Sequence, residues 1–164
     1  MEEDGRSYLE NARKKALAFA RASSLVAMAD DTGLEVDALD GAPGLHSKRF
    51  AGRHYAADAD RRAFLLETLR DKPRPWRARF HATIAIATPA GRVEFAEGYC
   101  EGEIVPGERG AGGFGYDAIF QVDALPKTMA ELSMEEKNQL SHRARAVQAA
   151  KPLLRELLDR SEGR

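Results

Sequence analysis

The sequence predicts an α/β protein built on a mixed sheet, and three patterns support this fold class. Apolar residues recur at helical spacing over residues 8–21 and again from Ser141 onward. Residues 77–87 alternate between apolar and polar side chains, which is typical of a half-buried strand. A turn at residues 89–91 leads into a second strand that begins at Val93, so we expect an antiparallel hairpin and not a doubly wound parallel sheet.

The N-terminal third combines one helix with two short strands. Ser7 and Glu10 form a capping box at the start of the helix. The apolar run 25–29 predicts a buried strand that ends in a polar turn at residues 30–33. A second, half-exposed strand is expected at residues 34–38, and a loop follows.

Further along the chain, Asp58 is expected to cap a helix that buries Phe64, Leu65 and Leu69. In the strand at 77–87, the face that carries His81 and Thr83 is expected to be the polar one.

In the C-terminal part, residues 116–122 predict another strand. Ser133 and Glu136 form a second capping box. Pro152 is expected to kink or divide the final helix, because proline lacks a backbone N–H.

Length and composition favour one soluble domain over residues 1–164, since 43% apolar residues are enough for one substantial core. Lys and Arg (25) nearly balance Asp and Glu (26), so no nucleic-acid-binding surface is expected. The apolar runs are too short to span a membrane. The single cysteine, Cys100, cannot form an internal disulfide, and the acidic start is unlike a secretory signal; both favour the cytoplasm.

Three groups of residues are candidates for chemistry. Asp30 and Asp31 follow an apolar run, and their side chains should point to opposite faces, so one can act on a ligand while the other braces the chain. The alternative is an ordinary Asp-rich turn. Residues 107–117 are rich in glycine, which lets backbone approach a ligand, and Phe114 offers a face for stacking on a base. A flexible hairpin loop is the alternative.

The third group is basic. Lys137, His142 and Arg143 lie around the junction of two late helical segments. Cations at a helix start oppose the helix dipole, so an anionic or carbonyl-bearing ligand nearby would explain them better. The alternative is an exposed basic pair that contributes little.

Four stretches in this order resemble the inosine triphosphate pyrophosphatase family: Glu10–Ala16 (ENARKKA), Ala29–Phe50, Gly112–Phe120 (GGFGYDAIF) and Ala130–Ala146. The resemblance implies magnesium-dependent hydrolysis of ITP, dITP and XTP to the monophosphate and pyrophosphate. It also implies helices on both sides of a twisted sheet, two lobes around a long substrate cleft, and a homodimer.

The resemblance also implies residue roles. Asp31 is the general base or a metal-bound carboxylate, and Glu3 is the second metal carboxylate. Thr32 contacts substrate, and Lys15 faces the phosphates. The remaining substrate-binding residues form the purine pocket: Phe114, Gly115, Tyr116, Asp117, Lys137, His142 and Arg143. A donor aimed at the 6-oxo group of hypoxanthine would meet another donor in adenine, which discriminates by roughly 10⁴-fold or more.

The sequence departs from the family at its start. Members of the family open with a strand and a T/S-x-N-x-x-K loop that wraps the triphosphate, and residues 1–7 do not resemble either. We therefore expect a domain truncated at its N-terminus relative to the family. A catalytically weak nucleotide-binding homologue is the alternative, and a magnesium nuclease that uses Asp30 and Asp31 is a distant third.

Overall fold

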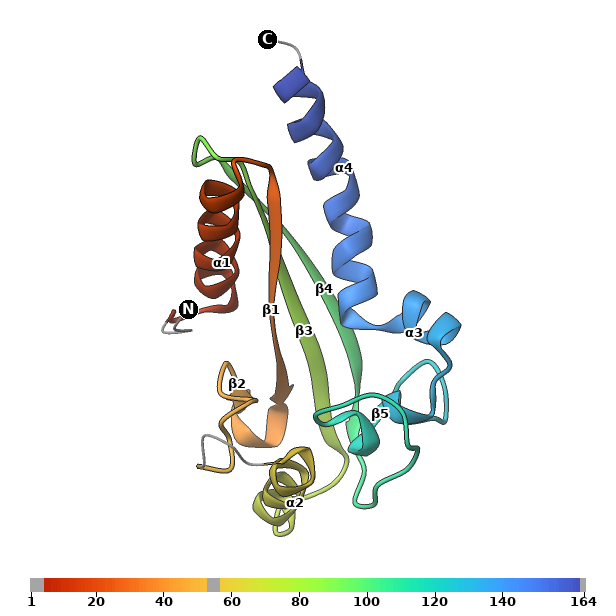
Figure 1. Cartoon of the computed structure of the whole chain (residues 1–164). Helices are drawn as coiled ribbons and strands as arrows, with labels where there is room; N and C mark the ends of the chain where they lie inside the picture. The colour runs from red at the N-terminus through yellow and green to blue at the C-terminus, as the bar shows by residue number, and fades with distance from the viewer. Residues whose placement is uncertain (1–4, 53–56, 163–164) are drawn as a thin grey trace. The chain divides into compact units, whose positions relative to one another are not determined.

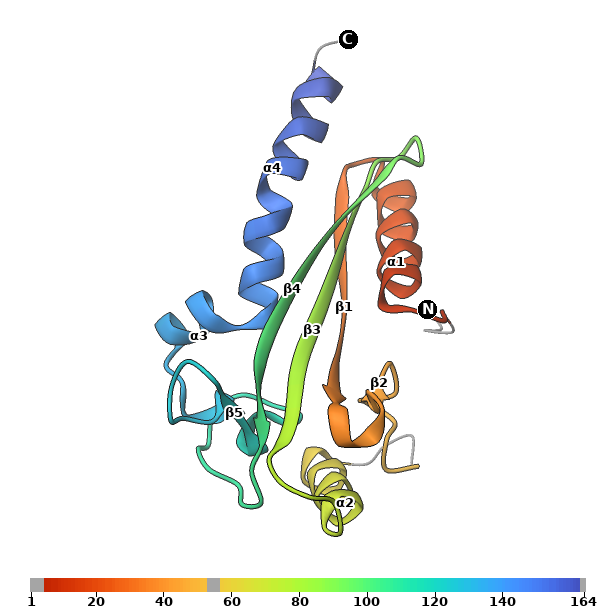
Figure 2. The same cartoon turned by 180° about the vertical axis from the view of Figure 1, so that it is seen from behind.

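A computed structural model of the chain describes residues 5–52 and 57–162 and confirms the α/β class (Figures 1 and 2). The described strands form a five-stranded antiparallel sheet in the order β2-β1-β3-β4-β5. Their bounds are β1 (Ala27–Val36), β2 (Pro43–Gly44), β3 (Trp76–Ala87), β4 (Val93–Ile104) and β5 (Phe120–Val122). The helices are α1 (Tyr8–Ser23), α2 (Asp58–Leu69), α3 (Met134–Leu140) and α4 (His142–Glu162).

The chain divides into two compact units, in line with the two predicted lobes. Unit 1 contains the described residues up to Thr32, together with His81–Tyr99 and the residues from His142 onward. Unit 2 contains Gly33–Phe80 and Cys100–Ser141. The predicted substrate cleft stays a prediction.

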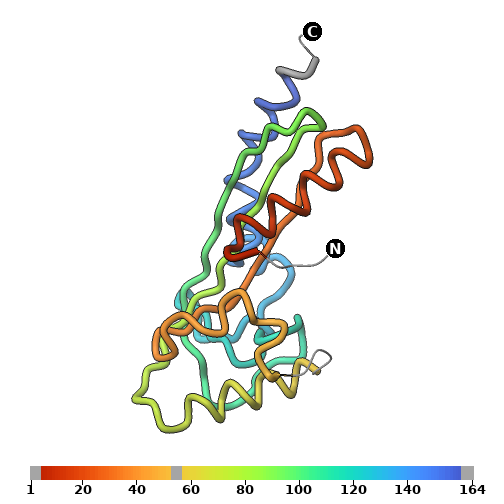
Figure 3. Tube along the Cα trace, turned by 90° about the vertical axis from the view of Figure 1, so that its left-hand side faces the viewer, coloured from red at the N-terminus to blue at the C-terminus, as the bar shows by residue number. Residues whose placement is uncertain are grey.

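In unit 1, helices cover both faces of the strands, as predicted. Alternate residues of β3 point to opposite faces. Ala85 and Ala87 lie in one apolar cluster with three buried alanines of α1, Ala12, Ala16 and Ala20. Ile84 and Ile86 lie in another cluster with Ala146, Ala150 and Leu157 of α4. Figure 3 shows how tightly the backbone turns between the end of α1 and the start of β1.

In unit 2, a single apolar cluster holds the elements together. The ring of Phe120 lies 4.5 Å from that of Phe80, measured between centroids. Leu65 and Leu69 of α2 and Ile119 are fully buried in the same cluster. This packing anchors α2 and the segment before β5, which both contact the glycine-rich loop described below.

Both predicted capping boxes start helices. Ser7 Oγ accepts a hydrogen bond from Glu10 N (3.1 Å), and α1 begins at the next residue, Tyr8. The Glu10 carboxylate returns to the amide of Arg6 (2.7 Å) instead of that of Ser7. At α3 the exchange between Ser133 and Glu136 is reciprocal, at 3.1 and 2.8 Å.

The predicted turn at residues 30–33 is wrong, because β1 runs without interruption from Ala27 to Val36. The polar residues stay extended because partners from both adjacent helices bind their side chains, as the next subsection shows. Leu25, expected in a buried strand, lies before β1 and is 67% exposed.

Three smaller expectations about the helices and strands are also corrected. Asp58 is the first residue of α2 and not its cap, and Phe64 is 45% exposed. Pro152 lies inside an undivided α4, since buried residues on both sides of it hold the helix against the strands. The face of β3 that carries Thr83 is buried under α1.

The predicted strand at 116–122 is instead a 3-10 turn at Asp117–Ile119 followed by β5. Within the described part of the chain, no helix is long and apolar enough to cross a membrane.

Candidate active site

Asp31 lies in the middle of β1, with its side chain facing α1. Asn11 Nδ2 donates a hydrogen bond to Asp31 Oδ2 (3.0 Å), and Lys15 Nζ donates to Oδ1 (3.1 Å). Asn11 and Lys15 are four residues apart, so both project from the same side of the helix. The Asp31 residue is only 8% exposed. We call Asn11, Lys15 and Asp31 the Asp31 cluster; it holds one carboxylate in a defined orientation beside one cation.

The backbone before α1 fixes the orientation of Asn11. Its side-chain oxygen accepts a hydrogen bond from Gly5 N (2.8 Å), so its amide nitrogen must point toward Asp31. A Cβ at position 5 would lie 2.4 Å from Asn11 Oδ1, so only glycine permits this approach. Glu3, the predicted second metal carboxylate, lies outside the described residues.

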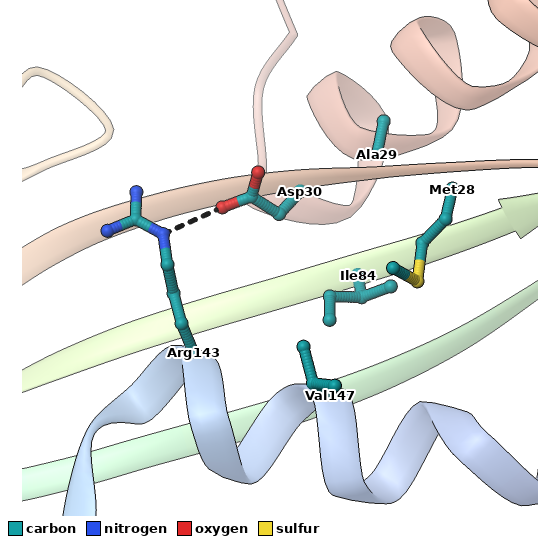
Figure 4. A pocket seen from close by; sticks show the side chains of 6 residues that line it. All are labelled: Met28, Ala29, Asp30, Ile84, Arg143 and Val147. Carbon is teal, nitrogen blue, oxygen red and sulfur yellow. Dashed lines mark hydrogen bonds and ion pairs between the residues drawn. The ribbon is translucent and has the colours of Figure 1, made fainter. Parts of the chain in front are cut away.

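Asp30 faces the other helix of unit 1. Arg143 Nε, on α4, donates to Asp30 Oδ2 (3.1 Å), and Arg143 Nη2 donates to Thr32 Oγ1 (3.0 Å). The predicted opposite directions of Asp30 and Asp31 are therefore confirmed. Figure 4 shows this ion pair at the edge of a pocket of about 190 Å³, whose apolar wall is formed by Met28, Ile84 and Val147.

His142 is the first residue of α4 and is almost completely buried (6% exposed). Burial, followed by the positive charge of Arg143, lowers the pKa of His142 from 6.5 to about 3. The imidazole is therefore neutral near pH 7. Gly98 on β4 lets the start of the helix lie close, because a Cβ there would be 2.3 Å from the carbonyl oxygen of His142.

In unit 2, Asp117 organises the end of the glycine-rich loop, which we define as residues 107–115. Its Oδ2 accepts hydrogen bonds from Lys137 Nζ (3.1 Å) and from Phe114 N (3.3 Å). Gly113 has a φ of +76°, and a Cβ on it would lie 2.0 Å from the same carboxylate oxygen. The Phe114 side chain itself is exposed (64%). An aromatic face is thus presented to solvent on a braced backbone.

Two neighbours of Phe114 are bound within unit 2. Asp58 Oδ2 accepts a hydrogen bond from Gly115 N (2.6 Å), and Arg62 Nη1 donates to Gly115 O (2.9 Å). The Tyr116 hydroxyl donates to Ser47 O (2.8 Å), and burial raises the pKa of Tyr116 to about 12. Tyr116 therefore acts as a neutral structural donor at ordinary pH.

The predicted site residues that the structure describes fall into three groups, two in unit 1 and one in unit 2. In unit 1, Lys15 and Asp31 lie on the α1 face of β1, whereas Thr32, Arg143 and the neighbouring His142 lie on the α4 face. Unit 2 brings together Phe114, Gly115, Tyr116, Asp117 and Lys137. Sequence reasoning missed Asn11, Asp58 and Arg62. Asn11 could have been found from its helical spacing to Lys15. Asp58 and Arg62 could not, because no pattern of neighbouring residues connects α2 to the glycine-rich loop.

These features define a class: an α/β protein with a buried, lysine-bound carboxylate in one unit and, in the other, a glycine-rich loop that presents an aromatic ring. Comparison with known proteins is more specific. Residues 1–153 match the Ham1 family, and the chain belongs to that family. The predicted family resemblance is thereby confirmed.

Similar proteins carry consistent names. A dITP/XTP pyrophosphatase of Desulforamulus reducens is 51% identical over 96% of this chain and 78% of its own length. One from Thermus thermophilus is 48% identical over 90% of this chain and 70% of its own length. A solved HAM1 protein from Coxiella burnetii superposes with a TM-score of 0.88 at 41% identity, covering 95% of this chain and 80% of that one.

Proposed function

We propose that this chain is a nucleoside triphosphate pyrophosphohydrolase that converts deaminated purine nucleotides (ITP, dITP and XTP) to the monophosphate and pyrophosphate. The names of the relatives support this activity. The observation that carries it in the structure is the Asp31 cluster, where a buried carboxylate is oriented by Asn11 and balanced by Lys15.

The reaction breaks the bond between the α- and β-phosphates and forms a new bond from a water oxygen to phosphorus. Asp31 acts as the general base that takes the water proton, or as a carboxylate ligand of the metal. General-base assistance contributes about 10²–10⁴-fold to a rate. Lys15 offers a positive charge to the phosphates, which stabilises the negative charge that develops during transfer.

The chemistry of Asp31 fits a magnesium ion. No described group of three or more His, Cys, Asp and Glu side chains could hold a metal. Mg²⁺, however, uses only one or two carboxylates and takes its other ligands from water and phosphate oxygens. Asp31 and Glu3 are the residues that would hold the ion, and a bound ion would neutralise charge on the triphosphate.

The base is recognised by the other predicted residues. Phe114 supplies a stacking face, with Gly115, Tyr116 and Asp117 supporting it and Lys137 paired to Asp117. Thr32, His142 and Arg143 are the other proposed nucleotide contacts. Arg143 favours a purine with a 6-oxo group over one with a 6-amino group, because guanidinium nitrogens only donate hydrogen bonds.

The test is pyrophosphate release from dITP, XTP and ITP, with dATP and ATP as controls, in Mg²⁺ and in EDTA. We expect release from the three deaminated substrates in Mg²⁺ and at least tenfold less from the controls. An Asp123→Asn variant, which changes a surface carboxylate paired with Arg77, should behave as the parent. Absence of pyrophosphate release from all five nucleotides would refute the proposal and favour a weakly active nucleotide-binding homologue.

Two further features belong to the proposal. The protein forms a homodimer, for which the exposed apolar side chains of Phe19 (58%) and Leu25 (67%) offer contact area. It works in the cytoplasm, consistent with a single buried cysteine, Cys100. Sedimentation equilibrium of the purified chain at micromolar concentration tests the first, and a monomer at all concentrations would contradict it.

A further inference from the structure

Helix α2 binds both polar backbone groups of one loop residue. Asp58 accepts the Gly115 N–H (2.6 Å), and Arg62 donates to the Gly115 carbonyl oxygen (2.9 Å). Asp58 and Arg62 are four residues apart, so they project from the same side of the helix. Gly115 adopts a φ of +61°, which favours glycine. The N–H and the carbonyl oxygen of Gly115 are therefore both held by side chains of the same helix.

Arg62 also binds the opposite end of the glycine-rich loop. Its Nε and Nη2 donate to the two carboxylate oxygens of Glu108, at 2.8 and 3.0 Å. One guanidinium thus joins residue 108 to residue 115. Only the planar fork of arginine provides three such donors in fixed directions. The arginine side chain is only 15% exposed, whereas that of Glu108 is 48% exposed, so the loop folds over the guanidinium.

This connection matters because the loop has little rigidity of its own. Five of its nine residues, 107–115, are glycine, and glycine loses more conformational entropy on ordering than any other residue. Between the two tethered ends lies Phe114, whose ring is exposed and whose amide is bound by Asp117. A ring that must stack on a base binds it more tightly when its backbone is already ordered.

We propose that Arg62 is a positioning residue for base binding. Together with Asp58, it orders the glycine-rich loop that carries Phe114 by joining Glu108 to Gly115. The inference rests on the proposed hydrolysis and adds to it a residue that strengthens nucleotide binding. Arg62 does not contact the reacting phosphate, so its loss weakens nucleotide binding through Phe114 while the chemical step proceeds. Base preference stays with Arg143, because stacking on an aromatic ring tolerates any base.

The experiment compares Arg62→Ala, Arg62→Lys and Glu108→Gln with Arg77→Ala. Arg77 is a matched control: it makes a bidentate ion pair with Asp123 in the same unit, at 2.8 and 2.6 Å, away from the loop. For each variant, kcat and KM are measured for dITP and dATP. Hydrogen exchange of the peptides that cover residues 107–117 is measured without nucleotide.

We expect Arg62→Ala to raise KM for dITP and dATP about tenfold, because nucleotide binding must then also order the loop. Its kcat should stay within about threefold, its preference for dITP over dATP should stay parental, and its loop should exchange faster. Arg62→Lys should recover only part of the loss, because one ammonium cannot replace the three-donor fork. Glu108→Gln should lie between Arg62→Lys and the parent. Arg77→Ala should match the parent in all four measurements.

Two results would overturn the inference while leaving the proposed function intact. One is an Arg62→Ala enzyme with a parental KM for both nucleotides. The other is an equal loss in Arg62→Ala and Arg77→Ala, which would mean general destabilisation of unit 2. An inactive parent chain would instead refute the proposed function itself, and the inference with it.

Discussion

The two faces of β1 carry neighbouring aspartates in opposite environments. Asp31 points to α1, where its side chain is 9% exposed and Lys15 and Asn11 bind it. Asp30 points to α4, where its side chain is 45% exposed and its partner Arg143 is 41% exposed. The effective dielectric constant is therefore low around Asp31 and high around Asp30, although the two residues are adjacent in sequence. Burial, not sequence context, separates a carboxylate suited to catalysis from one that positions an arginine.

The largest expected effect comes from neutralising the buried carboxylate of Asp31, and neutralising the exposed Asp30 is its control. Asp31→Asn should lower kcat for dITP by about 10²–10⁴-fold, because the amide can neither accept the water proton nor hold a metal as a carboxylate does. Asp30→Asn, on the exposed face, should lower kcat less than tenfold. A variant at position 31 that keeps more than a tenth of the parental kcat would remove the functional difference between the two faces.

Removing the cation of the buried face should have a smaller effect. Lys15→Ala should reduce kcat/KM about 10- to 100-fold through the loss of a charge-assisted contact to phosphate. Lys14→Ala changes the adjacent, exposed lysine of α1 and is the matched control. Steady-state kinetics on both variants decide the point, and equal effects at positions 14 and 15 would exclude a specific role for Lys15.

On the exposed face, Arg143→Ala should change selectivity more than stability. An exposed ion pair contributes only about 0–1 kcal/mol, so the free energy of unfolding should hardly change. The ratio of kcat/KM for ITP over ATP should fall about tenfold, since one donor to the 6-oxo group is lost. The control is Arg145, which lies on the same helix as Arg143 and donates a hydrogen bond to Tyr99 O of β4. Arg145→Ala should keep the parental ratio. An unchanged ratio for Arg143→Ala would assign base discrimination to another residue.

The last expected effect is on stability and not on activity, and it concerns the pH dependence of the free energy of unfolding. His142 has a pKa of about 3 in the folded chain, against 6.5 ordinarily. As pH falls below 6.5, the unfolded chain gains a proton at this residue while the folded chain does not, so the free energy of unfolding decreases until about pH 3. The contribution of His142 to stability is thus complete above pH 6.5 and is lost on acidification.

Urea unfolding of the parent and of His142→Gln between about pH 4 and 7 measures this effect. The free energy of unfolding of His142→Gln should depend less steeply on pH than that of the parent, and the difference in slope should be less than one proton. His46→Gln in unit 2 is the control. Identical slopes for the parent and His142→Gln would mean that His142 binds its proton equally well in the folded and the unfolded chain, and would contradict the lowered pKa.

Much of the local structure followed from patterns within a few residues. The Ser7 and Ser133 caps, the strand over 77–87 and the hairpin after it all depend on neighbours along the chain, and the structure contains them. The predicted polar face of that strand is wrong, because the strand is buried on both faces from Phe80 onward. The family could also be recognised from the sequence, because four separate stretches resemble the family and occur in the family's order. The candidate residues of the site came from those stretches, and their roles stay predictions.

What failed depended on residues far apart in sequence. Asp30 and Asp31 were expected to end a strand, since acidic residues favour turns. Partners 113 and 20 residues away, Arg143 and Asn11, instead bind their side chains and keep them within β1. The connection of Arg62 to Gly115 spans 53 residues and leaves no periodic trace in the sequence. Periodicity therefore determined the fold class, the capping boxes determined two helix starts, and the resemblance of four stretches determined the family of this protein. Only the tertiary structure decided which charges are buried and paired, because a polar group inside the fold is stabilised by whichever partner the packing brings to it.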